Sequence, residues 1–444
     1  MGNISKTFGL LRPSYSATTK YGPPRTRKQR RRLTRPLLVL LVVCVFGPLA
    51  YAKYGGGSGT AQDPYLIYTA EQFDAIGTNQ SDWNRHFKLT ADIDLSGYEG
   101  ADFNIIGYYV AWYSTDNIPF TGVFDGNDHT ISKFTYTSTD RDGIGLFSLV
   151  EGPGQIKDLG LVNPNIFAQG GYVGSLVGYL DGGTITGCYA KGVSISGNSN
   201  VGGLVGSNDG IIVNCCSSGS VSGNMLVGGL AGQVGPGTLA RCYSTARVSG
   251  NSDVGGLVGR VSDQTSEIKD CYATGTVIGG TYAGGLVGQL ERGAVYNCYS
   301  AGSVSGTQNV GGLVGYTRAL GIVVNSFWDT QTSGQPTSAG GTGKTTAQMQ
   351  TESTFASVGW DFYSIWDICE AANYPVLLWQ IPVGDFLCPD GVSFVDFSWF
   401  ADYWRQNYCN AANYYCQGID LDQSGSVDFS DLAIFADNWL AGCE

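Results

Sequence analysis

The chain has 444 residues, of which 66 are glycine, 43% are hydrophobic and only 14% are charged. This composition can supply a large apolar core and excludes a wholly disordered chain. Ten of the 25 basic residues and none of the 37 acidic residues lie in residues 1–52, so the rest of the chain is strongly acidic, which argues against nucleic acid as a partner.

The first 52 residues have the pattern of an export signal. The basic stretch RTRKQRRRLTR at 25–35 precedes the apolar run PLLVLLVVCVFGPLAYA at 36–52, which ends with small residues at Ala50 and Ala52. This order is typical of a secretory signal peptide cleaved near Ala52. An uncleaved anchor is the alternative, but the run is short for a membrane span of about 20 residues. We therefore expect a bacterial protein that is secreted or on the cell surface, with no stable transmembrane span after cleavage.

Residues 53–141 precede the repetitive part of the chain and are expected to form its lead-in and N-terminal cap. Thr69 and Gln72 have the spacing of a capping box in front of AEQFDAI, which predicts a short helix that covers an exposed end of the fold. The two histidines, His86 and His129, do not form a His-Glu-x-x-His motif, and Gly-x-Ser-x-Gly is also absent. The sequence therefore lacks these metalloprotease and hydrolase signatures.

Neighbouring carboxylates in the lead-in leave an enzymatic alternative open. Asp92 lies close to Asp94, and Asp125 lies close to Asp128. Alternation along a strand can place such a pair on one face, and glycoside hydrolysis needs two facing carboxylates. Aspartate in turns is the commoner explanation.

Residues 142–330 repeat one unit. A Gly-Gly-Leu-Val-Gly-like element is followed by a Cys-centred element such as NCYS and by a Gly-x-Val-x-Gly-like element such as GSVSG. The pieces are short and apolar, and they lack helical spacing, so they predict strands of about five residues. We expect a right-handed parallel β-helix, or solenoid, whose stacked coils bury a common core and whose glycines serve corners where φ is positive or no Cβ fits. The first element begins, at intervals of 28, 26, 27, 29 and 27 residues, at Gly174, Gly202, Gly228, Gly255, Gly284 and Gly311.

Five cysteines share one position of the unit and are expected to form an inward-facing column. We favour reduced core thiols, because free cysteine behaves as a small hydrophobic residue. Disulfides between adjacent coils are the alternative. A zinc site is disfavoured because Cys-x-x-Cys spacing and nearby histidines are lacking. The column residues are Cys188, Cys215, Cys242, Cys271 and Cys298.

The repeats resemble the GLUG motif of bacterial secreted and surface proteins. The segments HFKLTADIDLSG (86–97) and GWDFYSIWDICEAANYPVLLWQ (359–380) fit the same resemblance, which extends over residues 55–380. It implies a secreted β-helical protein of a family that spans adhesins and some proteases. Residues 331–382, which hold Trp360, Trp366 and Trp379, are expected to cap the C-terminal end of the solenoid.

Residues 383–444 differ in composition and form a separate small α-helical, EF-hand-like module. The stretch DLDQSGSVDFSD at 420–431 has the spacing of a calcium loop, with Gly425 at the sharp turn. Oxygen ligands suit a hard cation, and millimolar extracellular calcium can fill a modest site. The predicted calcium ligands are Asp420, Asp422, Ser424, the backbone carbonyl of Ser426, Asp428 and Asp431.

This module resembles a dockerin, a pair of loop–helix repeats. In the first repeat Asp390 and Asp396 remain, while Trp399 stands where the last ligand is expected, so we doubt tight calcium binding there. The resemblance implies attachment to a cohesin-like partner or a cell-surface protein. A helical hairpin with an accidental acidic turn is the alternative. Cys388, Cys409, Cys416 and Cys443 bracket the helices, and disulfides are expected in so small a module, with three pairings open.

These observations predict a mostly β protein and favour a binding protein over an enzyme. We expect a secreted, non-catalytic adhesion protein that engages carbohydrate or another surface ligand and is tethered through a calcium-dependent tail. The alternatives are a polysaccharide-degrading glycoside hydrolase or lyase with a docking tail, and a structural component of the cell envelope.

Overall fold

The computed structural model describes residues 53–388 and 390–439. The predicted signal peptide and Cys443 lie outside these residues. Within the described part of the chain, no helix has both the length and the apolar character needed to cross a membrane.

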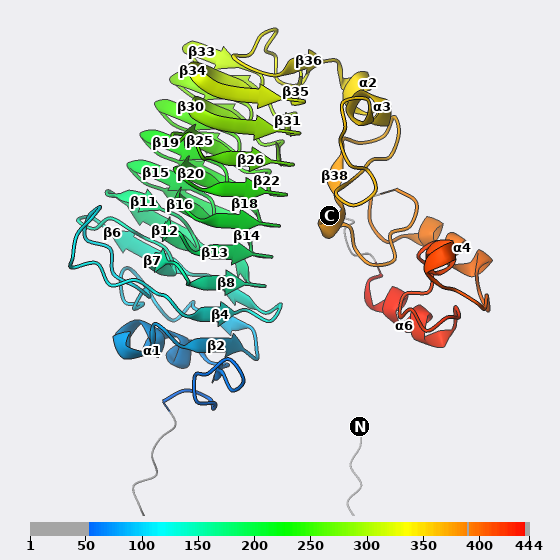
Figure 1. Cartoon of the computed structure of the whole chain (residues 1–444). Coiled ribbons are helices and arrows are strands. Elements are labelled where there is room, and N and C mark those ends of the chain that lie inside the picture. The colour runs from blue at the N-terminus through cyan, green and yellow to red at the C-terminus, as the bar shows by residue number, and fades with distance from the viewer. Residues whose placement is uncertain (1–52, 389, 440–444) are drawn as a thin grey trace, which may run out of the picture. The chain divides into compact units, whose positions relative to one another are not determined.

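The described chain is mostly β and winds as a parallel solenoid with a small helical region at its C-terminal end (Figure 1). One coil consists of β15 (Ser199–Gly202), β16 (Val205–Asn208), β17 (Ile211–Val213) and β18 (Cys216–Ser222), after which β19 (Met225–Gly228) begins the next coil on top of β15. The predicted solenoid is therefore confirmed.

Successive coils pair in register and build three parallel sheets. The first sheet contains β1 (Tyr65–Ile67), β2 (His86–Leu89), β4 (Val123–Asp125), β8 (Gln155–Lys157), β13 (Thr184–Thr186), β17, β21 (Thr238–Ala240), β26 (Glu267–Lys269), β30 (Val287–Tyr296), β25 (Val258–Val261), β20 (Ala231–Val234), β16, β12 (Val177–Asp181), β7 (Phe147–Glu151) and, beside β30, β34 (Val314–Val324). The second contains β3 (Ile93–Asp94), β5 (Thr130–Ser132), β9 (Gly160–Val162), β14 (Tyr189–Ser196), β18, β22 (Tyr243–Ser244), β27 (Tyr272–Ala273), β31 (Tyr299–Ser300), β35 (Phe327–Asp329) and β36 (Thr342–Lys344), joined by β6 (Thr135–Ser138), β10 (Asn165–Ala168), β23 (Arg247–Ser249), β28 (Val277–Ile278) and β32 (Val304–Ser305). The third contains β11 (Gly171–Val173), β15, β19, β24 (Ser252–Gly255), β29 (Thr281–Gly284) and β33 (Gln308–Gly311).

The register places like residues above like in the core. Ile212 pairs with Ile185 on one side and with Leu239 on the other, and all three are fully buried. The five column cysteines are buried free thiols, as expected. Each column sulfur lies beside backbone groups: the Cys242 amide donates to Cys271 Sγ over 3.4 Å. Ser326 continues the column, because its Oγ accepts from the Cys298 amide at 3.1 Å.

The expected role of the repeat glycines needs one correction. The glycines of the Gly-Gly-Leu-Val-Gly element have no positive φ, whereas the residue before each column cysteine does: Gly187, Asn214 and Asn297 have φ of 63°, 54° and 49°. The steric expectation holds, because a Cβ at Gly255 would collide with the carbonyl oxygen of Val258. Glycine is therefore required where the backbone doubles back on itself, while asparagine and aspartate, which tolerate the left-handed region, take most of the corners.

The predicted short helix is α1 (Ala70–Thr78), followed by η1 (Gln80–Asp82). Thr69 Oγ1 accepts from the Gln72 amide, while Gln72 Oε1 accepts from the amide of Tyr68 instead of that of Thr69. Phe73 of the helix is fully buried, with its ring 5.6 Å from that of Phe124 on β4. The helix therefore packs on the first rungs through its apolar side.

The closing segment covers a side of the solenoid in addition to extending its last rungs. It contains α2 (Thr346–Met349), α3 (Glu352–Ala356), β37 (Trp366–Asp367), β38 (Val376–Leu377) and η2 (Leu378–Gln380). Tyr272 and Tyr299, which stack with centroids 5.0 Å apart on neighbouring rungs, pack against Trp366. Trp379 Nε1 donates to the carbonyl oxygen of Arg241, further back along the rungs. This part of the second sheet is therefore closed to a large partner.

The C-terminal module consists of α4 (Phe394–Asp402), η3 (Ala411–Asn413), α5 (Tyr414–Gln417) and α6 (Phe429–Asp437) around a small core that includes Phe400 and Phe435. Two disulfides occur here, Cys409–Cys416 and Cys369–Cys388. Cys388 therefore pairs outside the four expected cysteines, with Cys369 of the closing segment. The sequence reasoning omitted Cys369 because it lies before the change in composition at residue 383. Disulfides are typical of extracellular proteins.

Candidate functional site

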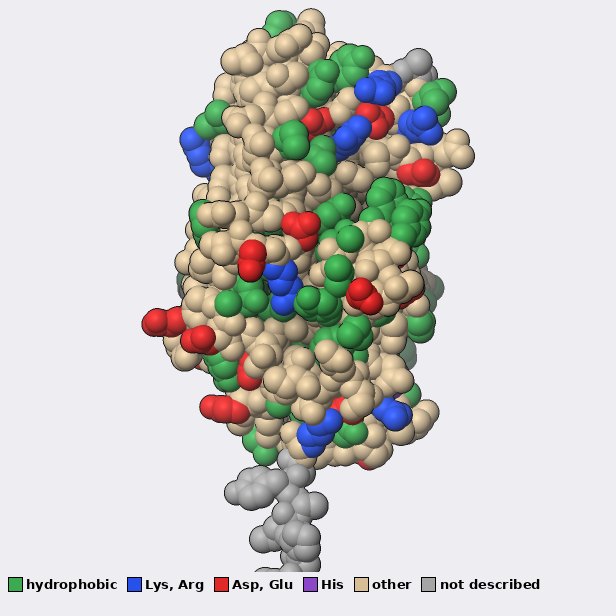
Figure 2. Space-filling model, turned by 90° about the vertical axis from the view of Figure 1, so that its left-hand side faces the viewer, with side chains coloured by type: hydrophobic (Ala, Val, Ile, Leu, Met, Phe, Trp, Pro, Cys, Tyr) green, Lys and Arg blue, Asp and Glu red, His purple; other side chains and the backbone are tan. Residues whose placement is uncertain are grey.

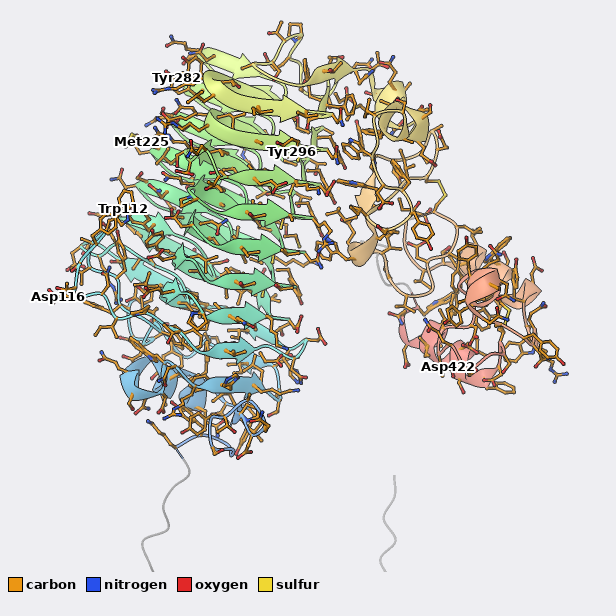
Figure 3. All side chains as sticks on the ribbon, in the orientation of Figure 1. Trp112, Asp116, Met225, Tyr282, Tyr296 and Asp422 are labelled. Atoms are coloured by element: carbon orange, nitrogen blue, oxygen red, sulfur yellow. A yellow bond between two sulfur atoms is a disulfide. The ribbon has the colours of Figure 1, made fainter. Side chains whose placement is uncertain are left out.

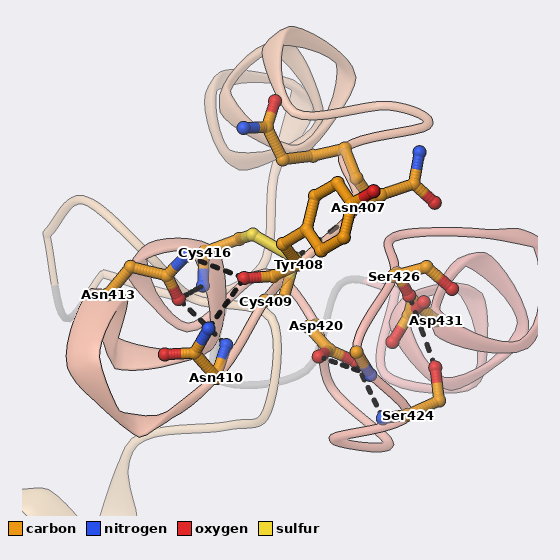
Figure 4. The surroundings of a disulfide bond; sticks show 12 residues. Asn407, Tyr408, Cys409, Asn410, Asn413, Cys416, Asp420, Ser424, Ser426 and Asp431 are labelled. Carbon is orange, nitrogen blue, oxygen red and sulfur yellow. Dashed lines mark hydrogen bonds between the residues drawn. A yellow bond between two sulfur atoms is a disulfide. The ribbon is translucent and has the colours of Figure 1, made fainter.

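The first candidate site is the acidic loop that leads into α6. Asp420, Asp422 and Asp431 offer carboxylate oxygens that all lie within 4.8 Å of one another. Ser424 Oγ donates to the carbonyl oxygen of Ser426 over 3.2 Å, so two further predicted ligands lie together. Figure 4 shows Asp420, Ser424, Ser426 and Asp431 grouped beside the Cys409–Cys416 disulfide.

The donor set and the turn fit a calcium ion. Calcium takes oxygen ligands at about 2.3–2.6 Å, so ligand atoms on opposite sides of the ion lie up to about 5 Å apart. Gly425 has φ of 100°, which provides the sharp turn at the sixth position. Burial and the neighbouring Asp431 raise the pKa of Asp420, which is 2% exposed. Such crowding of buried carboxylates is relieved when a divalent cation binds.

Asp428, another predicted ligand, lies outside this carboxylate group. It is the N-cap of α6, and its Oδ1 accepts from the Ser430 amide at 2.8 Å. Its own amide donates to Asp431 Oδ2 over 2.8 Å. The residue therefore orients the helix and the Asp431 carboxylate.

The first loop has a different alignment from the one expected. Asp396, not Trp399, occupies the last position: its Oδ1 accepts from the Phe386 amide and its Oδ2 from the Ser393 amide. Asp385 takes the first position, and its Oδ2 accepts from the Gly391 amide, one position further along the loop than the Gly425 amide that donates to Asp420 Oδ2. The expectation of a last ligand at Trp399 follows from matching Val-Asp-Phe-Ser at 395–398 with the same residues at 427–430, whereas the structure matches Phe-Ala-Asp-x-Trp at 400–404 with the same pattern at 435–439.

The first loop retains fewer oxygen ligands. The position that corresponds to Asp422 is Leu387, and Cys388 beside it is in the disulfide to Cys369. Burial, together with the neighbouring charge of Asp396, raises the pKa of Asp385 to about 6. With leucine in place of the carboxylate of Asp422, this loop is a poorer fit for calcium than the second loop.

The second candidate site is a side of the solenoid that we call the polar–aromatic flank. It is built from two columns of residues, one from the third sheet and one from the β16 half of the first sheet. The first column is Tyr172, Asn200, Leu226, Asp253, Tyr282 and Asn309. The second is Tyr179, Ser207, Gln233, Arg260, Gln289 and Tyr316.

Aromatic side chains gather at the N-terminal end of the flank. Tyr109, Tyr172 and Tyr179 lie with ring centroids 5.1–5.6 Å apart. Trp112 and Tyr113 stack 5.0 Å apart, and they are 62% and 87% exposed. Tyr109 and Tyr179 are buried, so the exposed platform consists of Trp112 and Tyr113. Exposed apolar patches of this kind mark interaction sites.

The loop that carries the platform is held in shape. Tyr108 and Ile118 exchange both backbone hydrogen bonds. Asn117 Oδ1 accepts from the Val110 amide at 2.7 Å, and its Nδ2 donates to the Ala111 carbonyl oxygen. Tyr113 adopts φ of 59°, a strained conformation for a bulky residue, although its side chain is exposed. The strained backbone at Tyr113 is thus part of the loop conformation that exposes the Trp112 and Tyr113 rings.

The middle of the flank is polar, and the C-terminal end is aromatic again. Asn200 Nδ2 donates to Gln233 Oε1 over 3.3 Å. Tyr282 stacks with Tyr316 at 4.9 Å. Figure 2 faces this side of the molecule, and Figure 3 shows Trp112, Met225 and Tyr282 on it.

Two polar atoms in the middle of the flank lack a hydrogen-bond partner among the described residues. They are Asp253 Oδ1 and Arg260 Nε, both shielded from solvent. Asp253 is 8% exposed, and its other oxygen accepts from Ser252 Oγ at 2.6 Å. A buried polar atom without a partner destabilises the fold by about 1–3 kcal/mol, so such atoms often belong to functional sites.

Three of the four carboxylates considered for catalysis in the lead-in are engaged elsewhere, and the fourth, Asp128, is exposed. Asp94 lies 2.7 Å from Lys133 Nζ, which lowers the pKa of Asp94 to about 2. Asp125 pairs with Lys157 at 2.8 Å, and Asp92 lies 3.3 Å from His129 Nδ1. Sequence reasoning missed the flank, because its residues are far apart in the chain and share only their place in successive repeats.

Comparisons with known proteins concern the repeats. The model of the GLUG motif matches residues 169–196, 250–278 and 279–305, so the chain carries GLUG motif repeats, and these form the solenoid. A stretch of 155 residues, 34% of the chain, is 32% identical to halomucin of Haloquadratum walsbyi. Another of 152 residues, 33% of the chain, is 34% identical to a "Putative Gly-rich membrane protein" of Evansella cellulosilytica. The matches span only 2% and 16% of those two proteins.

Two solved structures are similar in part. A "putative immunoglobulin A1 protease" of Bacteroides ovatus aligns over 74% of this chain and 96% of its own, with 23% identity and a TM-score of 0.48. A structure named "IgA1 Protease" aligns over 59% of this chain and 19% of its own, with 16% identity and a TM-score of 0.35.

Proposed function

We propose that this chain is an exported, non-catalytic binding protein that presents the polar–aromatic flank to carbohydrate at a surface and is attached through its C-terminal module. The observation that supports the proposal most is the flank, where the exposed Trp112 and Tyr113 rings lie at one end of a polar strip and the half-buried Tyr282 and Tyr316 rings lie at the other. Sugar rings have apolar C–H faces that pack on aromatic rings, and their hydroxyl groups exchange hydrogen bonds with amides, carboxylates and guanidinium groups.

Calcium would bind in the second loop of the C-terminal module. Asp420, Asp422, Ser424, Asp431 and the Ser426 carbonyl oxygen would hold it, with Asp428 behind them. When bound, the ion neutralises the crowded carboxylates and ties the loop to the start of α6. The chain itself orients one of these ligands, because the Leu421 and Asp422 amides donate hydrogen bonds to Asp431 Oδ1.

The same module would dock to a cohesin-like or other cell-surface protein. Phe394 and Phe429 occupy equivalent positions at the starts of α4 and α6, and they are 78% and 74% exposed. Phe397 and Leu432 line an apolar hollow of about 270 Å³ between these helices. Exposed apolar surface beside a hollow is typical of a site for another protein. Calcium would make the attachment conditional, because it fixes the loop that begins α6.

A glycan array tests the function, with the full chain applied in calcium and in chelator and with released sugars measured in parallel. We expect glycan binding in both conditions, no new reducing ends, and surface attachment only in calcium. Released sugars would contradict the non-catalytic assignment and favour the polysaccharide-degrading enzyme. Absence of any glycan signal would favour a structural component of the envelope.

A further inference from the structure

The two aromatic ends of the flank stand at a fixed distance, because the solenoid sets it. Tyr179 and Tyr316 belong to the same column and are separated by five rung steps, through Ser207, Gln233, Arg260 and Gln289. Parallel strands lie about 4.8 Å apart, so the two tyrosines are about 24 Å apart along the axis. This distance is much longer than one sugar ring.

Two groups between the two ends are partly accessible to a ligand. Gln233 and Arg260 are half-buried, whereas Asn200, Ser207, Asp253 and Gln289 are buried. The charges nearly balance, because Arg260 Nη2 lies 2.5 Å and Arg318 Nη2 lies 3.4 Å from Glu291 Oε1, and Asp253 adds a second carboxylate near Arg260. A ligand without net charge therefore fits this strip better than an anionic one.

The C-terminal end of the flank has a hollow beside its tyrosine rings. A hollow of about 600 Å³ beside Tyr316 is lined by Ser262, Glu291, Arg292 and Thr317. The Thr317 hydroxyl is buried without a partner among the described residues. The N-terminal end has the Trp112 platform, with Asp209 and Gln233 next to it. Each end thus combines an aromatic face with polar edges, which is the chemistry of a sugar subsite.

We propose that the flank binds a neutral linear polysaccharide that runs parallel to the solenoid axis, with ring subsites at Trp112 with Tyr172 and at Tyr282 with Tyr316. The inference rests on carbohydrate as the ligand class of the proposed function. A sugar chain advances by about one rung spacing per residue, so a chain of about five residues joins the two subsites. Because the two subsites then act on one molecule, affinity increases steeply with chain length until both are filled.

Calorimetry with the full chain in calcium tests this inference. The probes are neutral cello-, xylo-, manno- and chito-oligosaccharides of two to eight residues, chosen by which series gives heat. We expect affinity to rise at least about tenfold between three and six residues and then to level off. Trp112→Ala and Tyr316→Ala should each reduce the affinity for the hexasaccharide to that for the trisaccharide. The double variant should lose binding.

Tyr363→Ala is the matched control, because Tyr363 is 82% exposed but belongs to the closing segment. It should leave every affinity unchanged, and circular dichroism melts should be equal for all variants. Glycan binding that does not depend on length would overturn this inference and leave the proposed function standing. Glycan binding that survives the double variant would overturn both, because the proposed function also places the ligand on the flank. If no oligosaccharide series gives a heat of binding while the C-terminal module still binds calcium, both this inference and the proposed function are overturned. A protein ligand for the Trp112 platform would then be the explanation to pursue.

Discussion

Asp396 and Asp431 make matching hydrogen bonds in two successive loop–helix units. In each, Oδ1 accepts from two backbone amides at the start of the loop and Oδ2 accepts from the amide of the N-cap residue. Only the second loop adds further carboxylates within 4.8 Å. The two aspartates are therefore equivalent in the fold but not in what they can coordinate.

Calcium uptake should depend on Asp431 and not on Asp396. Titration calorimetry on the full chain should give one equivalent of calcium, and Asp431→Asn should abolish it, because a charged ligand is lost. Asp396→Asn is the matched control and should keep one equivalent. Two equivalents in the natural chain would contradict the assignment of the first loop, and uptake that survives Asp431→Asn would contradict the ligand set.

Asp385 should make stability depend on pH in the acidic range. Its folded pKa of about 6 lies above the value of 3.8 for a free side chain, so the folded state binds the proton more tightly. Stability due to this group is therefore highest at low pH and is lost as pH rises from about 4 to above 6. In thermal melts with chelator, Asp385→Asn should be more stable than the natural chain at pH 7.5 and equal to it at pH 4.

Asp402→Asn is the control for that experiment, because Asp402 is exposed at the end of α4. It should change stability little at either pH. An Asp385→Asn variant that is less stable at pH 7.5 would show that the charged carboxylate is stabilised by a cation or another partner.

The column thiols should be unreactive in the native protein. Burial raises the pKa of Cys215 and of Cys271 well above the usual value, and the thiolate is the reactive form. Iodoacetamide followed by mass spectrometry should leave all five column cysteines unmodified in the native state and modify all five after unfolding without reductant. Modification that requires a reductant would show disulfides between coils.

Gly255→Ala should weaken the solenoid. The added methyl group would collide with the carbonyl oxygen of Val258, where the backbone cannot move without shifting two rungs. Denaturant unfolding should show a loss on the order of 3 kcal/mol. Gly97→Ala is the control, because a Cβ there has no neighbour within 4 Å, and it should change stability by less than about 0.5 kcal/mol. Equal effects at the two positions would contradict the steric explanation.

The solenoid and its core could be predicted because each rung repeats the same constraints. An apolar residue three positions before each column cysteine, such as Ile212 before Cys215, fixes the register once the period is known. The acidic loop could be predicted for a similar reason, since its ligands lie within twelve consecutive residues and depend on local geometry.

The flank, and the side of the second sheet that the closing segment covers, depend on contacts between residues far apart in the sequence. Tyr109 and Tyr179 meet although one lies in the lead-in and the other in a repeat. Trp379 reaches the carbonyl oxygen of Arg241 across more than a hundred residues of chain. Short-range patterns carry no signal for such pairs, and Cys369 was overlooked as the partner of Cys388 for the same reason.

Ser326 at the end of the cysteine column has a consequence for the evolution of the molecule. Successive rungs present the same backbone donors and acceptors to each other, and in the last rung the Ser326 Oγ takes the place of the cysteine sulfur. Duplication of one unit would therefore insert a turn without disturbing either terminus, and deletion would remove one. Under the proposal that the flank binds a linear polysaccharide, each added or removed rung would lengthen or shorten the distance between the two aromatic subsites by one rung spacing, so the number of repeats would set the length of the ligand.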